Sequence, residues 1–120
     1  MMDTGHYLAR MRATAPLVRT ITNFVAMTMM ANMQLAAGAS PAMVHAQKEV
    51  AEFAALSQAL TVTIGTLDTA SAEAMEMAAG VLNAADKPWV LAPVGAGAVL
   101  LMGGICEAIH APPCWPNRLA

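Results

Sequence analysis

Residues 60–91 read LTVTIGTLDTASAEAMEMAAGVLNAADKPWVL, and they give the clearest indication of the fold class. It begins with an apolar run over 60–64 that is rich in Val, Ile and Thr, the residues that strands prefer. Asp68 then stands where a helix N-cap belongs, because its carboxylate can accept hydrogen bonds from the free N–H groups of a first helical turn. A helix over 69–85 and a short strand at 90–91 follow. The stretch therefore predicts a strand–helix–strand unit.

The helix predicted over 69–85 has one apolar stripe and one polar face. The stripe follows the spacing i, i+3, i+4 and i+7 with Met75, Ala78, Ala79 and Leu82. Glu73 and Glu76 lie three residues apart and are expected on the solvated face. Lys87 and Pro88 end the helix.

The same alternation extends towards the N-terminus. We expect a strand over 17–23, a helix over 25–37 that stops at Gly38, and a short strand over 42–44. A helix over 48–58 follows, and its apolar face is expected to hold Val50, Phe53, Ala54 and Leu56. Four strand–helix alternations predict an α/β fold with a parallel sheet and right-handed crossovers. The near-continuous apolar strands indicate that both faces of this sheet are buried.

The composition limits the classes of partner. The chain has 120 residues, of which 58% are hydrophobic and 12% charged, whereas average soluble domains carry about 25% charged residues. Much of the surface is therefore expected to be covered by further sequence, by other subunits or by lipid. The net charge is -2 and no run of Lys or Arg occurs, so nucleic acid is not expected as a partner.

Residues 88–106 form an uncharged stretch near the length of a membrane-spanning helix. Prolines and glycines interrupt it, and its first part resembles a short buried strand, so we do not expect it to enter a membrane. The first residues include charged side chains and lack the apolar stretch of a secretory signal. Cys106 and Cys114 match no zinc or redox spacing, and a reducing cytoplasmic setting is the expectation.

Ligands of open parallel sheets bind beyond the carboxyl ends of the strands. The predicted strand ends are 22–23, Met43, 65–66 and 93–95. Their glycines let backbone amides approach a ligand, and their Asn and Thr side chains can hydrogen-bond to it. Turns between strands and helices also need these residue types for their geometry alone. The strand ends by themselves therefore favour a small-molecule site and a purely structural role about equally.

Three other features resemble functional sites. The turn Gly95-Ala96-Gly97 is not a dinucleotide-binding loop, because Leu100 occupies the sixth position and no acidic residue follows about twenty positions on. His45 has no sequence neighbour that would form a catalytic or metal pair with it. Four methionines of the second helix are interpreted as filling irregular core or subunit contacts rather than binding a metal: Met27, Met29, Met30 and Met33.

Six segments, taken together in order and spacing, resemble hydroxyethylthiazole kinases. They are ITNFV (21–25), AN (31–32), LAAGASPAM (35–43), IGTL (64–67), EAM (73–75) and PVGAGA (93–98). The resemblance covers about residues 7–98. It is the combination that is specific, since the last turn alone would not be.

This resemblance implies a ribokinase-like α/β fold, of which the chain holds an incomplete parallel sheet, and assembly as a homotrimer. It also implies transfer of the ATP γ-phosphate, with Mg²⁺, to the hydroxyl of 4-methyl-5-(2-hydroxyethyl)thiazole in thiamine salvage. Carried over by position, Met43 contacts the thiazole alcohol. Asn23 and Val25 line a site shared between subunits, and Gly65 and Thr66 complete the pocket.

The chain departs from the family pattern at three positions and after residue 98. Ala92 replaces an Asp, and Mg²⁺ prefers anionic oxygen ligands, so binding of Mg²⁺ and ATP by this chain is in doubt. Thr28 replaces an Asn and Met33 replaces a Gly. The family's later Arg-Gly-Asn-x-x-Glu segment and Gly-Ala-Gly anion hole are not found.

Residues 112–116 read PPCWP and resemble no earlier segment. We therefore expect two parts, an N-terminal part of a kinase domain over 1–98 and an aberrant tail over 99–120. Our hypothesis is that a reading-frame shift near Ala98 produced this tail, and translating the downstream DNA in the other two frames tests it. The expected function is a truncated thiazole kinase without activity. The alternatives are a thiazole-binding or subunit-interaction fragment and, third, a small membrane-associated protein.

Overall fold

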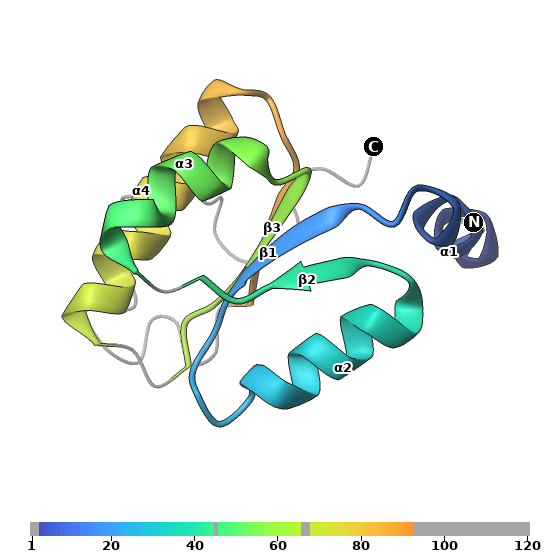
Figure 1. Ribbon diagram of the computed structural model, residues 1–120, viewed down its shortest axis with the longest axis horizontal. Coiled ribbons are helices and arrows are strands. Elements are labelled where there is room, and N and C mark those ends of the chain that lie inside the picture. The colour runs from blue at the N-terminus through green and yellow to red at the C-terminus, as the bar shows by residue number, and fades with distance from the viewer. Residues whose placement is uncertain (1–2, 45, 66–67, 93–120) are drawn as a thin grey trace.

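The computed structural model describes residues 3–44, 46–65 and 68–92 (Figure 1). In this part of the chain four helices alternate with four strands. The elements are α1 (Thr4–Thr14), β1 (Leu17–Ile21), α2 (Met27–Ala37), β2 (Ser40–Ala42), α3 (Gln47–Leu56), β3 (Ala59–Thr63), α4 (Thr69–Ala84) and β4 (Trp89–Ala92).

The described strands form one parallel sheet in the order β2-β1-β3-β4. Thr20 of β1 is level with Thr61 of β3, and Thr61 is level with Val90 of β4. On the other side of β1, Val18 is level with Pro41 of β2. The predicted parallel α/β fold is confirmed.

The apolar core lies between the sheet and two helices, α3 and α4, which pack together on one face (Figure 1). Leu60 and Val62 of β3 contribute to it from the sheet. All four residues of the stripe predicted for α4 are buried, and Glu73 and Glu76 are exposed, as expected. Leu56 is exposed, so its assignment to the buried face of α3 was wrong. It lies about 120° around the helix from Val50, because each residue turns the helix by about 100°.

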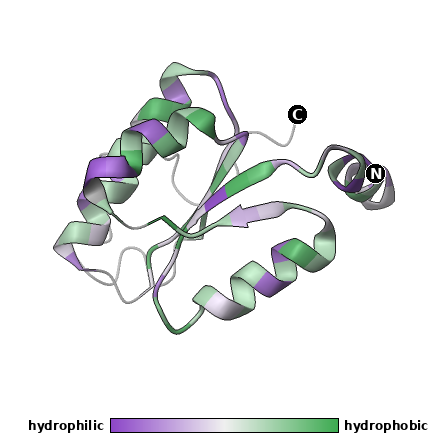
Figure 2. Ribbon diagram, viewed as in Figure 1, coloured by the Kyte–Doolittle hydropathy of each residue, from purple (hydrophilic) through white to green (hydrophobic). Residues whose placement is uncertain are grey.

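The opposite face of the sheet is covered by α2, which attaches through polar contacts. Gln34 Nε2 donates to Thr20 Oγ1 at 2.8 Å, and the hydroxyls of Thr20 and Thr61 lie 2.9 Å apart. No residue of α2 itself is buried, although Figure 2 shows that the helix is apolar along most of its length. The helix therefore leaves an apolar outer surface.

Two elements differ from the sequence expectation. The helix α1 was not predicted, because none of its residues is buried and it shows no apolar stripe; Asp3 caps it by accepting from Gly5 N at 3.1 Å. The strand β2 begins at Ser40, two residues before the predicted start, and includes Pro41. Proline is tolerated there because β2 pairs only with β1 in the described sheet, so a missing N–H breaks no second ladder.

Other predicted features lie outside the described residues. They are the turn at 95–97, the tail over 99–120, His45, Thr66 and most of the uncharged stretch over 88–106. Residues 89–92 of this uncharged stretch form the strand β4. Among the described residues no helix is long and apolar enough to cross a membrane.

Candidate functional site

The strand order creates a reversal between β1 and β3. The chain passes from β1 through α2 to β2 on one side, and then through α3 to β3 on the other side of β1. Such a reversal separates the loops that follow the two central strands, and open α/β sheets bind their ligands in the crevice that results. The candidate site therefore lies at the carboxyl ends of β1 and β3.

Asn23 joins the two strands at this point. Its side-chain Nδ2 donates to the carbonyl oxygen of Gly65, which follows β3, at 3.3 Å. Its Oδ1 accepts from the backbone N–H of Ala26 at 2.8 Å, at the start of α2. Because Ala26 offers no side-chain cap of its own, Asn23 also fixes the first turn of the helix. The residue thus sets the shape of the loop at the carboxyl ends of β1 and β3.

Met43 follows β2 and is half-buried, as are Asn23 and Gly65. The sheet order brings the ends of β2, β1 and β3 side by side, so these three residues follow neighbouring strands at one edge. The sequence prediction placed all three at strand ends, and the sheet brings those ends together. Thr66, the next residue expected in the pocket, lies outside the described residues.

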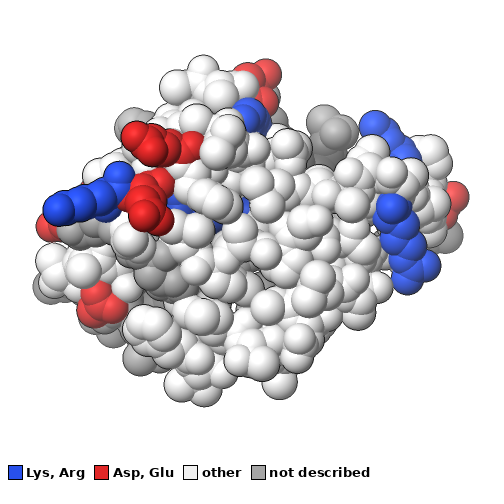
Figure 3. Space-filling model, viewed as in Figure 1, with Lys and Arg blue, Asp and Glu red and all other residues white. Residues whose placement is uncertain are grey.

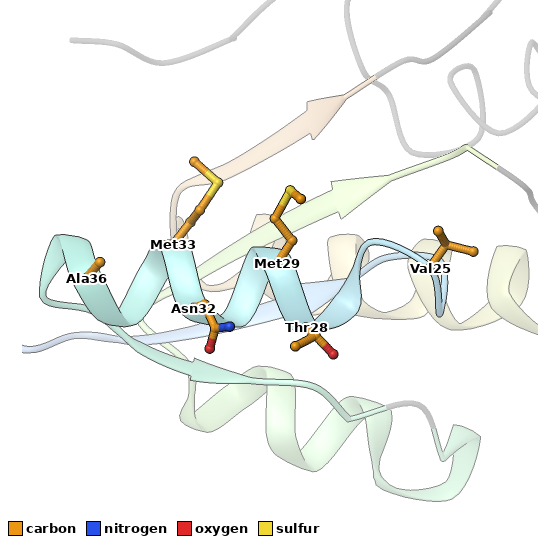
Figure 4. A pocket seen from close by; sticks show the side chains of 6 residues that line it. All are labelled: Val25, Thr28, Met29, Asn32, Met33 and Ala36. Atoms are coloured by element: carbon orange, nitrogen blue, oxygen red, sulfur yellow. The ribbon is translucent and has the colours of Figure 1, made fainter.

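Val25 lies in the turn that connects β1 to α2, and 92% of its surface is exposed. It also lines an open hollow of about 550 Å³ along the outer surface of α2. The other lining residues are Thr28, Met29, Asn32, Met33 and Ala36. In Figure 4, Met29 and Met33 leave the helix on the same side, whereas Thr28 and Asn32 leave it on another.

The sequence interpretation assigns the α2 methionines to core or subunit contacts, and no residue of α2 is buried in the described part of the chain. Met29 is 68% exposed and Met33 is 63% exposed. Helical spacing alone did not reveal this, because apolar residues occur all around α2. The interpretation of these side chains as a subunit contact stays a prediction.

Comparison with known proteins decides the family. The profile of the hydroxyethylthiazole kinase family matches residues 8–110. The chain belongs to this family.

Individual hydroxyethylthiazole kinases agree with this assignment. The protein of Cereibacter sphaeroides is 56% identical over 101 residues, which are 84% of this chain and 38% of the relative. That of Rhizobium rhizogenes is 61% identical over 90 residues, or 75% of this chain and 34% of the relative. A solved structure of a hydroxyethylthiazole kinase protein from Pyrococcus horikoshii OT3 matches with a TM-score of 0.82 and 44% identity, covering 87% of this chain and 41% of that one.

The chain therefore spans between about a third and two fifths of the length of these hydroxyethylthiazole kinases. The structural match confirms the ribokinase-like fold predicted from the sequence. The match to the family profile extends past residue 98, where the quoted motifs end.

The sequence offered no signal for Arg19, a buried cation in β1, one of the two central strands of the described sheet. Its side chain is fully buried, Nη1 donates to the carbonyl of Val50 at 2.6 Å, and Nη2 donates to that of Val44 at 2.8 Å. Burial lowers the pKa of Arg19, because the charged form loses its hydration. These partners lie 31 and 25 residues away in sequence, beyond the reach of a local motif.

The resemblance predicts the use of Mg²⁺ and ATP, but the described residues do not fit a magnesium ion. Ala92, which ends β4, has no carboxylate, and both polar atoms of Asn23 are engaged within the protein. Among the described residues no group of three His, Cys, Asp or Glu side chains could hold a metal ion.

Proposed function

We propose that the chain binds 4-methyl-5-(2-hydroxyethyl)thiazole at the carboxyl ends of β2, β1 and β3. The observation that supports this most is the hydrogen bond from Asn23 to Gly65 at the strand reversal, with Met43 following the neighbouring strand. A thioether side chain is apolar and polarizable, which suits contact with a thiazole ring. A glycine lets the ligand approach the backbone, and the exposed side chain of Val25 is available at the rim.

The family reaction transfers the ATP γ-phosphate to the thiazole hydroxyl, and we propose that this chain retains binding without measurable transfer. Phosphoryl transfer depends on positioning and on neutralising the charge of the phosphates. Ala92 has no charge to hold a magnesium ion at the position where the family has an Asp. A role in thiamine salvage and a cytoplasmic location belong to the same proposal.

Isothermal calorimetry of the purified chain with the thiazole alcohol tests the binding. We expect heat of binding that saturates at or below millimolar ligand. The matched control ligand is 4-methyl-5-ethylthiazole, which lacks the hydroxyl and is expected to bind more weakly, since a hydrogen-bonding group is lost. No heat at millimolar alcohol rejects retained binding, and ATP-dependent phosphorylation of the alcohol by the chain contradicts the claim of inactivity.

A second candidate function is contact between subunits, and the exposed methionines of α2 favour it. Helix α2 carries no charged residue, and its outer surface exposes Val25, Met29 and Met33 around the hollow. Large exposed apolar patches mark interaction sites in soluble proteins. We propose that this surface contacts another copy, as in the trimer that the resemblance implies. Light scattering at several protein concentrations measures the mass of the assembly.

A further inference from the structure

Arg19 is a charged side chain in the middle of a buried strand. The strand β1 has neighbours on both sides in the sheet, and Ile21, two residues on, belongs to the apolar core. The exposed fraction of Arg19 is 0%. Both carbonyl oxygens to which its Nη atoms donate are neutral, and its Nε makes no hydrogen bond to the part of the chain that the structure describes.

One accepting carbonyl lies in the connection between β2 and α3, and the other lies in α3 itself. Val44 lies two residues after the end of β2, and Val50 lies in the first turns of α3. One planar guanidinium therefore links the end of the strand to the start of the helix. Arginine suits this task, because its donors are fixed in a rigid fork.

Among the described residues, this connection has few other restraints. The strand β2 has three residues, and in the described sheet it pairs with β1 alone. The helix α3 begins after Ala46, which makes no side-chain capping hydrogen bond. In other connections of this kind, a longer strand or a capping side chain supplies the polar contacts. Here the two hydrogen bonds from Arg19 supply them.

Stability alone does not account for a guanidinium at this position. Removing a cation from water is costly, and apolar replacements of buried charged groups are often neutral or stabilising. Met43 stands immediately before Val44, so a contact that fixes Val44 also fixes the backbone of Met43.

We infer that Arg19 is a positioning residue that holds the connection after β2 and so presents Met43 at the carboxyl edge of the sheet. The role in ligand binding rests on the proposed function, whereas the restraint of the backbone does not.

The variants are Arg19→Met, which removes the charge and both donors, and Arg19→Lys, which keeps the charge without the planar fork. Lys87→Met is the matched control, because Lys87 donates to the carbonyls of Ala55 and Ser57 at the opposite end of α3. Backbone ¹⁵N relaxation reports the order of Met43 and Val44 in each full-length variant, and calorimetry reports the affinity for the thiazole alcohol.

In Arg19→Met we expect the amide order parameters of Met43 and Val44 to fall from about 0.85 to below about 0.6, the range of flexible backbone. The affinity for the thiazole alcohol is expected to fall about tenfold, the equivalent of one lost hydrogen bond to a charged group. Arg19→Lys is expected to give intermediate values, and Lys87→Met is expected to leave both readings unchanged. If Arg19→Met does not fold, the relaxation and calorimetry of Arg19→Lys alone test the inference.

Unchanged order at Met43 and Val44 in both Arg19 variants overturns the inference. An equal loss of order throughout the sheet also overturns it, since that is the mark of a merely structural role. If the unaltered chain binds no thiazole alcohol, the proposed function fails, and the relaxation data still decide whether Arg19 restrains the connection.

Discussion

Asn23 uses both ends of its side-chain amide inside the protein, and this determines what its removal does. One end bonds to the carbonyl of Gly65 beyond β3, and the other accepts from the N–H of Ala26 before α2. The amide therefore connects three segments that are adjacent only in the folded chain. Its effect on a ligand is indirect, because it shapes the loop in which Val25 lies.

We predict that Asn23→Ala lowers the free energy of unfolding by about 2 kcal/mol, because it leaves a half-buried carbonyl and an N–H without their partners. Urea unfolding monitored by circular dichroism measures this. The thiazole affinity is expected to fall as well, because the loop loses its restraint.

Asn83→Ala is the matched control for this change. Asn83 Oδ1 accepts from Trp89 Nε1 at 2.8 Å on the surface, so water can replace the contact. Alanine also favours the helix in which Asn83 lies. We expect a loss below about 1 kcal/mol. An Asn23→Ala chain as stable as the Asn83→Ala chain contradicts the bridging role.

At the scale of the elements, the end of α2 depends on a glycine that no other residue replaces without strain. Gly38 has a φ of 102°, in the left-handed region. A Cβ added there would lie 2.5 Å from Arg12 Cγ and 3.0 Å from Arg12 Cα in α1. The glycine thus ends α2 and lets α1 approach it.

We predict that Gly38→Ala destabilises the chain by about 1–2 kcal/mol from the backbone conformation alone, with a further loss from the contact with Arg12. Gly80→Ala is the control with the opposite sign. Gly80 lies inside α4 with no atom within 4 Å of an added Cβ, so alanine is expected to stabilise the helix by about 0.5–1 kcal/mol. Thermal unfolding of both variants checks the pair, and the same sign in both contradicts the argument.

The sequence predicted best the elements whose apolar or β-branched residues follow a local pattern. The stripe of α4 and the β-branched run of β3 are local patterns, and both elements were found within a residue or so of their predicted bounds. The sequence predicted that α2 is a helix, but it did not predict how this helix attaches to the sheet. Gln34 Nε2 donates to hydroxyls on two strands, those of Thr20 and Thr61, and no periodicity in the sequence indicates such a contact.

The candidate site was predictable in part for a related reason. Strand ends meet at one edge of any parallel sheet, so Asn23, Met43 and Gly65 could be grouped from the strand order alone. The partners of Arg19 could not be predicted from the sequence, because both are backbone carbonyls and carry no residue-type signal. The exposure of Met33 could not be predicted either, because apolar residues occur all around α2.

At the scale of the whole molecule, charge and apolar surface are separated. In Figure 3 the charged side chains gather over α3, α4 and α1, and the surface over α2 carries none. Val90 of β4 is also 49% exposed, although it lies within a strand. A chain with such a surface is expected to have poor solubility unless a partner covers it.

We predict that Met33→Asp reduces association of the chain with itself. A carboxylate on the outer surface of α2 must lose its hydration if that surface is covered, which costs several kcal/mol in an apolar contact. The unaltered chain is expected to scatter light as an assembly heavier than its 12.4 kDa monomer, and Met33→Asp as a species close to that mass. Met77→Asp on α4 is the control, since Met77 is also an exposed helical methionine but lies on the charged side of the molecule. It is expected to keep the mass of the unaltered chain. A monomeric unaltered chain at every concentration, or an equal effect of both substitutions, means that the surface of α2 is not the contact between copies.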